Sequence, residues 1–179
     1  MAGNDTTVSA GRSACIALAA LLANGCAEAP IPTVAHVDLE RFMGRWYVLA
    51  SIPTFLERGA HNAVETYRRD TDGTIDTTFT FRRDAFDGEL VEYRPRGFVS
   101  AESPAVWRMQ FIWPIKAEYR IVYLDPDYSQ TVIGRSKRDY VWLMARTPEI
   151  PEADYERFLG LIRVLGYDAA KITRVPQRW

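Results

Sequence analysis

Apolar and polar residues alternate with a period of two along most of the chain, and this alternation limits the possible fold more than any other feature. Large apolar side chains occupy every second position over much of residues 75–81, 105–111, 119–123 and 140–144. Such a pattern is typical of β-strands that bury one face. The sequence therefore predicts a protein built mainly from strands.

Turn-forming residues separate the predicted strands, for example at residues 70–73, 103–104 and 125–127. They recur roughly every 10 to 15 residues, which leaves no room for crossover helices, so strands adjacent in sequence should pair antiparallel. Eight strands are expected over residues 46–145. Closing them into a barrel hides both edge strands and leaves an interior for one small ligand. We therefore predict an all-β fold, an eight-stranded antiparallel up-and-down barrel.

One amphipathic helix follows the last predicted strand. Pro151 begins this helix, Gly166 ends it, and its apolar residues form a single stripe. Such a stripe must pack against another surface, and the outside of the barrel is the large surface available. We expect in addition a short helical turn that begins at Asp38 and a short final strand over residues 171–175.

The first part of the chain has the composition of an export signal. Residues 14–23 are all apolar or small, too few to span a bilayer but enough for the apolar stretch of a secretory signal. A small residue directly before Cys26 resembles a bacterial lipoprotein processing site, at which the cysteine is lipidated. An ordinary cleaved signal and a wrongly chosen start methionine are the alternatives. We expect a leader over residues 1–26, a tether over residues 27–37 and a barrel domain over residues 38–179.

Charge and motif content argue against several function classes. The chain has 22 Lys and Arg residues against 23 Asp and Glu residues, so it has no excess of positive charge for nucleic acid. Both cysteines, Cys15 and Cys26, precede the expected barrel, and the histidines are His36 in the tether and His61. No motif of nucleophilic, phosphate-binding or zinc chemistry occurs. We therefore expect no enzyme activity, no metal and no cofactor, with haem ligation by His61 as the alternative.

Three motifs resemble those of the lipocalin family. Residues 44–47, Gly-Arg-Trp-Tyr, are similar to the signature at the start of its first strand, residues 125–128 to its second motif, and Arg146 to its third. The flanking residues resemble most closely the branch of bacterial outer-membrane lipoproteins, near apolipoprotein D. The resemblance implies a barrel with one closed end, where the Arg146 guanidinium lies over the Trp46 indole. The structural signature residues that it implies are Gly44, Trp46, Asp127, Tyr128 and Arg146.

The resemblance also implies a ligand-binding calyx with its mouth at residues 53–62, 82–88, 113–117 and 136–139. If Trp46 faces inward, the alternation predicts which side chains of the later strands line the interior. The alternative is a solid core without a cavity. The expected ligand-binding residues are Glu65, Tyr67, Thr77, Phe79, Arg94, Arg96, Phe98, Trp107, Met109, Phe111, Tyr119, Ile121, Tyr123, Tyr140 and Trp142.

Charged side chains inside a barrel are costly unless they are paired or solvated. An inward Arg94 or Arg96 near the mouth would meet the anionic head group of a ligand. The alternative is that a bulge in the fourth strand turns both arginines outward. Either arrangement is compatible with acyl-chain binding, because each buried methylene contributes about 0.8 kcal/mol without any charge.

The sequence thus predicts an extracytoplasmic protein that binds and stores or transports a fatty acid or lysophospholipid for maintenance of the cell envelope. Its partners would be that ligand and, through the lipid on Cys26, a membrane, and it would be a monomer or homodimer. We expect it on the periplasmic side of the outer membrane, or otherwise periplasmic or secreted. The alternative function is an enzyme or accessory factor on a lipocalin scaffold that acts on an isoprenoid-type ligand.

Overall fold

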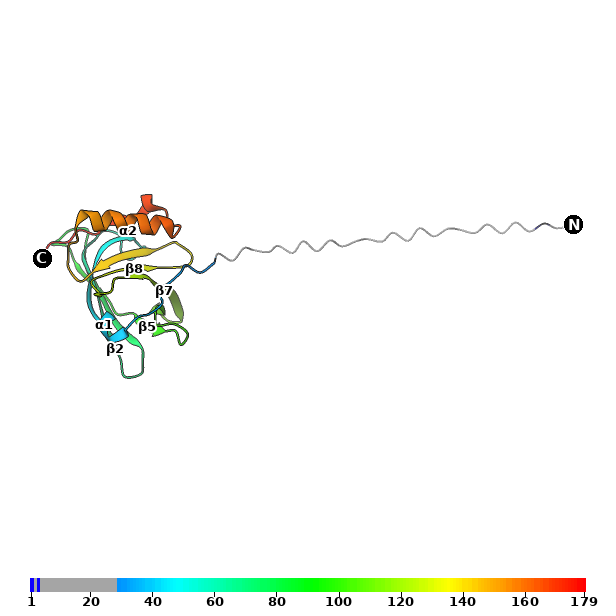
Figure 1. Ribbon diagram of the computed structural model, residues 1–179, viewed down its shortest axis with the longest axis horizontal. Coiled ribbons are helices and arrows are strands. Elements are labelled where there is room, and N and C mark those ends of the chain that lie inside the picture. The colour runs from blue at the N-terminus through cyan, green and yellow to red at the C-terminus, as the bar shows by residue number, and fades with distance from the viewer. Residues whose placement is uncertain (2, 4–28) are drawn as a thin grey trace.

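Strands surround a central interior in the described part of the chain, which comprises residues 1, 3 and 29–179 of this computed structural model (Figure 1). Cys15, Cys26 and nearly all of the predicted leader lie outside the described residues. The strands are β1 (Gly44–Ile52), β2 (Ala60–Arg69), β3 (Ile75–Arg83), β4 (Leu90–Tyr93), β5 (Arg96–Val99), β6 (Val106–Ile112), β7 (Ile115–Leu124), β8 (Gln130–Gly134), β9 (Val141–Ala145) and β10 (Thr173–Arg174).

Antiparallel pairing closes these strands into a barrel. Consecutive strands pair from β1 to β3 and from β5 to β9, and β9 returns to pair with β1. Both β4 and β5 pair with β3, so they are two halves of one strand that is interrupted at Arg94 and Pro95. Proline has no N–H to donate to a neighbouring strand, which explains the interruption. Within residues 29–179 the barrel therefore has eight strand positions, and the predicted architecture is confirmed.

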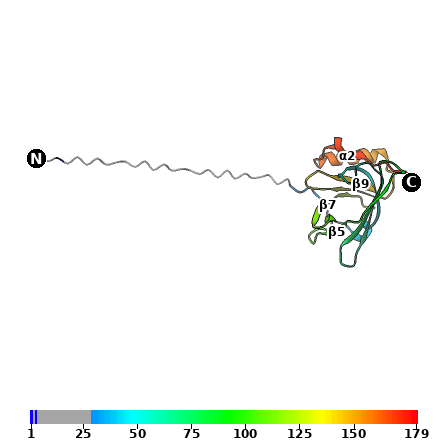
Figure 2. The ribbon, with the colours of Figure 1, turned by 180° about the vertical axis from the view of Figure 1, so that it is seen from behind.

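The helix α2 (Glu152–Val164) covers the outer face of β1, β8 and β9 (Figure 1). Its buried residues Tyr155, Phe158 and Ile162 pack in one cluster with outward-facing side chains of the strands, among them Leu49 and Leu143. Seen from behind, the same helix lies over β9 (Figure 2). The predicted position of the helix is confirmed. None of the helices in the described residues combines the length and the apolar character needed to cross a bilayer.

The short helix α1 (Leu39–Phe42) lies at the base of the barrel. The Asp38 carboxylate accepts hydrogen bonds from two backbone N–H groups of its first turn, as predicted. Phe42 is fully buried against Trp46, with 5.1 Å between the ring centroids. The Trp46 indole in turn donates a hydrogen bond of 2.9 Å to the Phe42 carbonyl. The indole is thus fixed by its ring and by its N–H.

Arg146 links this base to the end of β9. Its guanidinium lies 3.8 Å from the centroid of the Trp46 ring. Burial lowers the pKa of Arg146 to about 10, so the group stays charged at neutral pH. Gly44 has a φ of 93°, and a Cβ there would lie 3.4 Å from Arg146 Nη1, so only glycine suits the position. The predicted contact of the two signature residues is confirmed. The guanidinium donates hydrogen bonds to the carbonyl oxygens of Arg41, Phe42, Met43, Arg45 and Tyr128.

The second motif contributes through two of its residues. The Tyr128 hydroxyl accepts a hydrogen bond of 2.7 Å from the backbone N–H of Asp38, which ties the turn after β7 to α1. The Asp125 carboxylate holds that turn by accepting hydrogen bonds from the backbone N–H and hydroxyl of Ser129. Asp127 itself is exposed. The hydrogen bonds that hold this turn go to Asp125, so the structural role expected of Asp127 stays a prediction.

Residues 29–37 do not hang free as the predicted tether would. Ile31 is fully buried, and its carbonyl accepts a hydrogen bond from the Arg120 side chain. The backbone N–H of Val34 donates to the Ile121 carbonyl at 3.0 Å, and Val37 joins the core of the barrel. The prediction of a tether is wrong for this stretch. Its prolines suggested a linker, but its apolar side chains pack against the barrel.

We predict that Arg146→Ala lowers the free energy of unfolding by about 3 kcal/mol, because it removes the stack on Trp46 and leaves a group of carbonyl oxygens without a donor. Trp46→Ala should cost a similar amount by opening a cavity. Denaturant unfolding measures both. Arg45→Ala, which removes an exposed arginine side chain two residues after Met43, serves as the control. Equal free energies of unfolding for Arg45→Ala and Arg146→Ala would contradict the structural role of Arg146.

Candidate functional site

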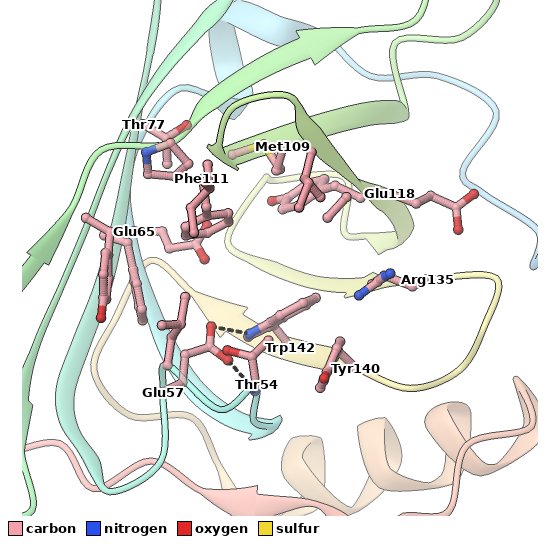
Figure 3. A pocket seen from close by; sticks show the side chains of 18 of the residues that line it. Thr54, Glu57, Glu65, Thr77, Met109, Phe111, Glu118, Arg135, Tyr140 and Trp142 are labelled. Carbon is pink, nitrogen blue, oxygen red and sulfur yellow. Dashed lines mark hydrogen bonds between the residues drawn. The ribbon is translucent and has the colours of Figure 1, made fainter.

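The barrel interior is solid at its base and hollow above it. The hollow part is a cavity of about 310 Å³. Its wall is mostly apolar, and it is bordered by side chains of β2, β3, β4, β6, β7 and β9 and of the loop between β1 and β2 (Figure 3). The predicted residues that line it are Glu65, Thr77, Phe79, Met109, Phe111, Tyr119, Tyr140 and Trp142.

Three of the predicted residues point inward but lie outside the wall of the cavity. Tyr67, Trp107 and Ile121 are buried to 99–100 % in the core that holds Phe42. The Trp107 ring stacks on that of Tyr119 at 5.1 Å, and its indole N–H donates to the Pro104 carbonyl at 2.7 Å. Alternation thus predicted the side of the sheet on which these residues lie, but it contains no information about their depth along the barrel.

Arg94, Arg96 and Phe98 were expected to face the interior, and the structure places all three outside. Arg94 donates to Glu92, and Arg96 forms ion pairs with Asp70 and Asp72. Lys116 covers the ring of Phe98, with its ammonium 3.4 Å from the ring centroid.

The reason is that the interior face of this strand carries the odd-numbered residues. Val91 is buried, Tyr93 and Pro95 line the cavity, and Gly97 faces inward, where a Cβ would lie 3.1 Å from the Met109 sulfur. No bulge is needed, since apolar residues at 91, 93, 95 and 99 alternate with charged ones. That alternation is the signal that should have placed Tyr93 and Pro95 inside.

Tyr123 was also expected inside and lies beneath α2 instead. Its ring meets that of Phe158 edge to face at 5.1 Å, and its hydroxyl accepts from Arg157. The register between β7 and β8 shifts between Ile121 and Tyr123. An extra residue on one strand reverses which face the following side chains occupy. This bulge explains why the alternation fails at one position.

Loop residues form the mouth of the cavity. Phe55, Ile112 and Ile115 line it and are nevertheless 65–73 % exposed, so the cavity opens between the β1–β2 loop and the β6–β7 turn. Phe55 and Ile115 lie in the segments 53–62 and 113–117 that the sequence placed at the mouth, whereas Ile112 lies just before the second segment and was not identified. Residues 82–88 were expected at the mouth and contribute nothing to the wall. His61, considered only as an alternative haem ligand, is also absent from the wall and packs its ring on Phe86, with 4.9 Å between the ring centroids.

Glu57 attaches the mouth loop to the barrel wall. Its two carboxylate oxygens accept hydrogen bonds from the Trp142 indole at 3.0 Å and from the backbone N–H of Thr54 at 2.8 Å (Figure 3). Burial raises the pKa of Glu57 above its usual value. The loop is thereby folded inward over the cavity.

Glu65 is a second carboxyl group inside the barrel. It is 8 % exposed and lines the cavity, and it accepts a hydrogen bond from the Tyr67 hydroxyl. The Tyr67 hydroxyl also lies 2.7 Å from that of Tyr119. Burial, with a smaller contribution from the charge of Glu57, raises the pKa of Glu65 to about 8. At neutral pH the side chain is therefore mostly a neutral carboxylic acid.

Arg135 is the basic side chain in the cavity wall (Figure 3). Its Nη1 lies 3.4 Å from Asp139, and its guanidinium lies 5.2 Å from the centroid of the Tyr140 ring. Its Nε is buried and has no hydrogen-bond partner among the described residues. An arginine near the mouth was predicted to meet an anionic head group, and Arg135 occupies the position that Arg94 and Arg96 were expected to fill.

Comparisons with known proteins identify the fold family. The sequence profile of the Lipocalin-like domain matches residues 37–177. The chain belongs to the lipocalin family. It is 30% identical over 151 residues to temperature-induced lipocalin-1 of Arabidopsis thaliana, covering 80% of this chain and 81% of that protein. It is 27% identical over 166 residues to outer membrane lipoprotein Blc of Escherichia coli K12, covering 90% and 93%.

Solved lipocalin structures share this fold. Insecticyanin from the tobacco hornworm Manduca sexta aligns with a TM-score of 0.64 at 13% identity, over 81% of this chain and 83% of that one. Lobster apocrustacyanin A1 aligns with a TM-score of 0.63 at 12% identity, over 84% and 92%. The family supports binding of a small hydrophobic ligand in the barrel, and the resemblance in the sequence motifs is confirmed.

We predict that Glu65→Gln stabilises the protein more strongly at about pH 9 than at about pH 5. The pKa of Glu65 is about 8 in the folded protein and lower in the unfolded chain. The contribution of Glu65 to stability is therefore fully present below the unfolded pKa and is lost as the pH rises through about 8, where the carboxyl group ionises inside the barrel. Glutamine keeps the shape and removes this titration. Melting temperatures of both proteins across this range measure the effect. A difference that stays constant with pH, as expected for the exposed control Glu156→Gln, would contradict the burial of an ionisable Glu65.

Proposed function

We propose that this lipocalin binds one fatty acid or lysophospholipid, with the acyl chain in the cavity and the anionic head group at Arg135. The observation that carries the proposal is an apolar cavity of about 310 Å³ with a basic side chain near its open end. This volume is at the lower end of the range for small-molecule sites. It therefore favours a ligand with one acyl chain over a ligand with two.

Two features support this orientation of the ligand. Phe79, Met109 and Phe111 provide apolar contacts in the wall, and each buried methylene contributes about 0.8 kcal/mol to binding. An anion deeper in the barrel, beside Glu65, would be buried away from the basic side chain of the wall, whereas Arg135 has an N–H without a hydrogen-bond partner in the described residues. A negatively charged head group is therefore best placed at the mouth.

We propose that the protein binds or carries its ligand without chemical change. The residues that line the cavity include no histidine, cysteine or serine. Nucleophilic catalysis needs an activated nucleophile beside a base, and the wall holds threonine hydroxyls and carboxyl groups without an imidazole or a thiol. The isoprenoid-modifying alternative has no observation in its favour in the described residues.

We further propose an envelope location with a lipid anchor on Cys26. The proposal is supported by the apolar stretch before Cys26 and by similarity to outer membrane lipoprotein Blc of Escherichia coli and of Vibrio cholerae, the latter 26% identical over 171 residues. A membrane-attached lipocalin that binds single-chain lipids would serve the maintenance of envelope lipids.

Filling the cavity should weaken binding. We predict that Ala117→Trp, which places a large ring in the wall, weakens binding of hexadecanoic acid at least tenfold, about 1.4 kcal/mol, in isothermal titration calorimetry. Lys116→Trp puts the same ring at the neighbouring exposed position of β7 and should bind like the wild type. Binding that is equally tight in Ala117→Trp would place the ligand outside this cavity.

The anchor has its own test. Wild-type protein should fractionate with membranes and incorporate labelled palmitate, because acyl chains attached to a cysteine hold a protein at the bilayer. Cys26→Ser should do neither. If both proteins are equally soluble and unlabelled, the leader is an ordinary signal and the protein is free in the periplasm or secreted.

A further inference from the structure

The inner part of the cavity carries polar groups that an acyl chain alone leaves unused. Glu65, Thr77 and Tyr119 contribute these groups among otherwise apolar side chains. The Thr77 residue is only 1 % exposed, and its hydroxyl has no hydrogen-bond partner among the described residues. A buried hydroxyl without a partner is uncommon, because it loses its bonds to water and gains none in return. Thr77 lies in the cavity wall, so its hydroxyl is an unsatisfied polar group at the edge of the ligand site.

The protons of this cluster can be assigned from its contacts. The Tyr67 hydroxyl donates its proton to one oxygen of Glu65, so in its contact with Tyr119 it must accept, and Tyr119 donates. The Tyr119 oxygen keeps a free acceptor site. The second oxygen of Glu65 has no recorded partner in the described residues, and in the neutral acid it carries the proton. The cluster therefore offers a ligand one donor from Glu65, one acceptor on Tyr119, and a Thr77 hydroxyl that does either.

A neutral hydroxyl group matches this set, since it donates one hydrogen bond and accepts up to two. A carboxylate matches less well, because it has no proton for the free acceptor site on Tyr119 and its charge would be buried away from Arg135. Arg135, the basic side chain of the wall, lies across the cavity from Glu65 and Thr77 (Figure 3). An anionic group therefore belongs at the Arg135 side and a neutral polar group at the Thr77 side.

We propose that Glu65, Thr77 and Tyr119 form a subsite for a hydroxyl group at the buried end of the ligand. This inference rests on the proposed function and names its ligand class more closely: a single-chain lipid with an acidic group at the mouth and a hydroxyl at the far end of the chain. The β-sheet holds the subsite in place, because Thr77 on β3 pairs with Tyr67 on β2, and Glu65 pairs with the neighbouring Phe79. Its polar groups are thus fixed before the ligand arrives.

The test compares two acids that differ in one group. In calorimetric titrations near neutral pH, ω-hydroxyhexadecanoic acid should bind the wild-type protein about tenfold more tightly than hexadecanoic acid, as expected for hydrogen bonds to buried groups that otherwise stay unpaired. Thr77→Val, which replaces the hydroxyl by a methyl group, should reduce this preference several-fold. Thr77→Ser should retain it. Thr78→Val makes the same change at the adjacent, outward-facing position of β3 and should behave like the wild type.

The outcomes distinguish failure of the proposed lipid binding from failure of the hydroxyl subsite. If neither acid binds, the proposed function is wrong. If both bind the wild type equally, lipid binding stands and the hydroxyl subsite is wrong. A preference that survives in Thr77→Val overturns the role of Thr77, and Thr77→Ala replaces that variant if it does not fold. Tighter binding of ω-aminohexadecanoic acid than of the hydroxy acid would overturn the proposal in favour of a site for a cation.

Discussion

The stack of the Arg146 guanidinium on the Trp46 indole is the contact on which the rest of the barrel depends. It lies where the first turn, the start of β1 and the end of β9 meet, and its hydrogen bonds reach the carbonyls of Arg45 and Tyr128. A charge in this half-buried position is tolerated because nearly all its donors are used. With this end closed, the cavity opens at the opposite end, beside Phe55, Ile112 and Ile115.

Because the base is closed, the cavity has an inner end and a mouth, and these two ends differ in polarity. Trp107 and Tyr67 are buried in the core of the lower barrel, whereas the wall above them encloses the cavity. Within that cavity, Arg135 near the mouth and Glu65 farther inside differ in their preference for charge. Burial raises the pKa of Glu65 to about 8 and so favours its neutral form. The site is therefore built to orient a ligand with two different ends.

The sequence predicted the barrel, the outer helix and the paired signature residues, because each depends on local periodicity or on a short motif. It predicted the cavity wall less well, for reasons specific to particular residues. Alternation identified Trp107 as inward-facing but not its depth along the barrel. The bulge before Tyr123 reversed the alternation. On the fourth strand the even-numbered residues were assigned to the interior, although the odd-numbered ones face it. Phe55 and Glu57 lie in a loop that the sequence placed at the mouth, but no period shows which of its side chains enter the cavity, and Arg135 lies just outside the predicted segment 136–139.

The central claim is that a single-chain lipid occupies the barrel in the protein as its host makes it. Native mass spectrometry of protein purified from the envelope, followed by extraction and identification of the bound molecule, tests this claim most directly. The account predicts one bound lipid per barrel, with one acyl chain, an acidic head group and an unmodified structure. A protein that carries no lipid and takes none up, or that carries a chemically converted product accumulating with time, would contradict it.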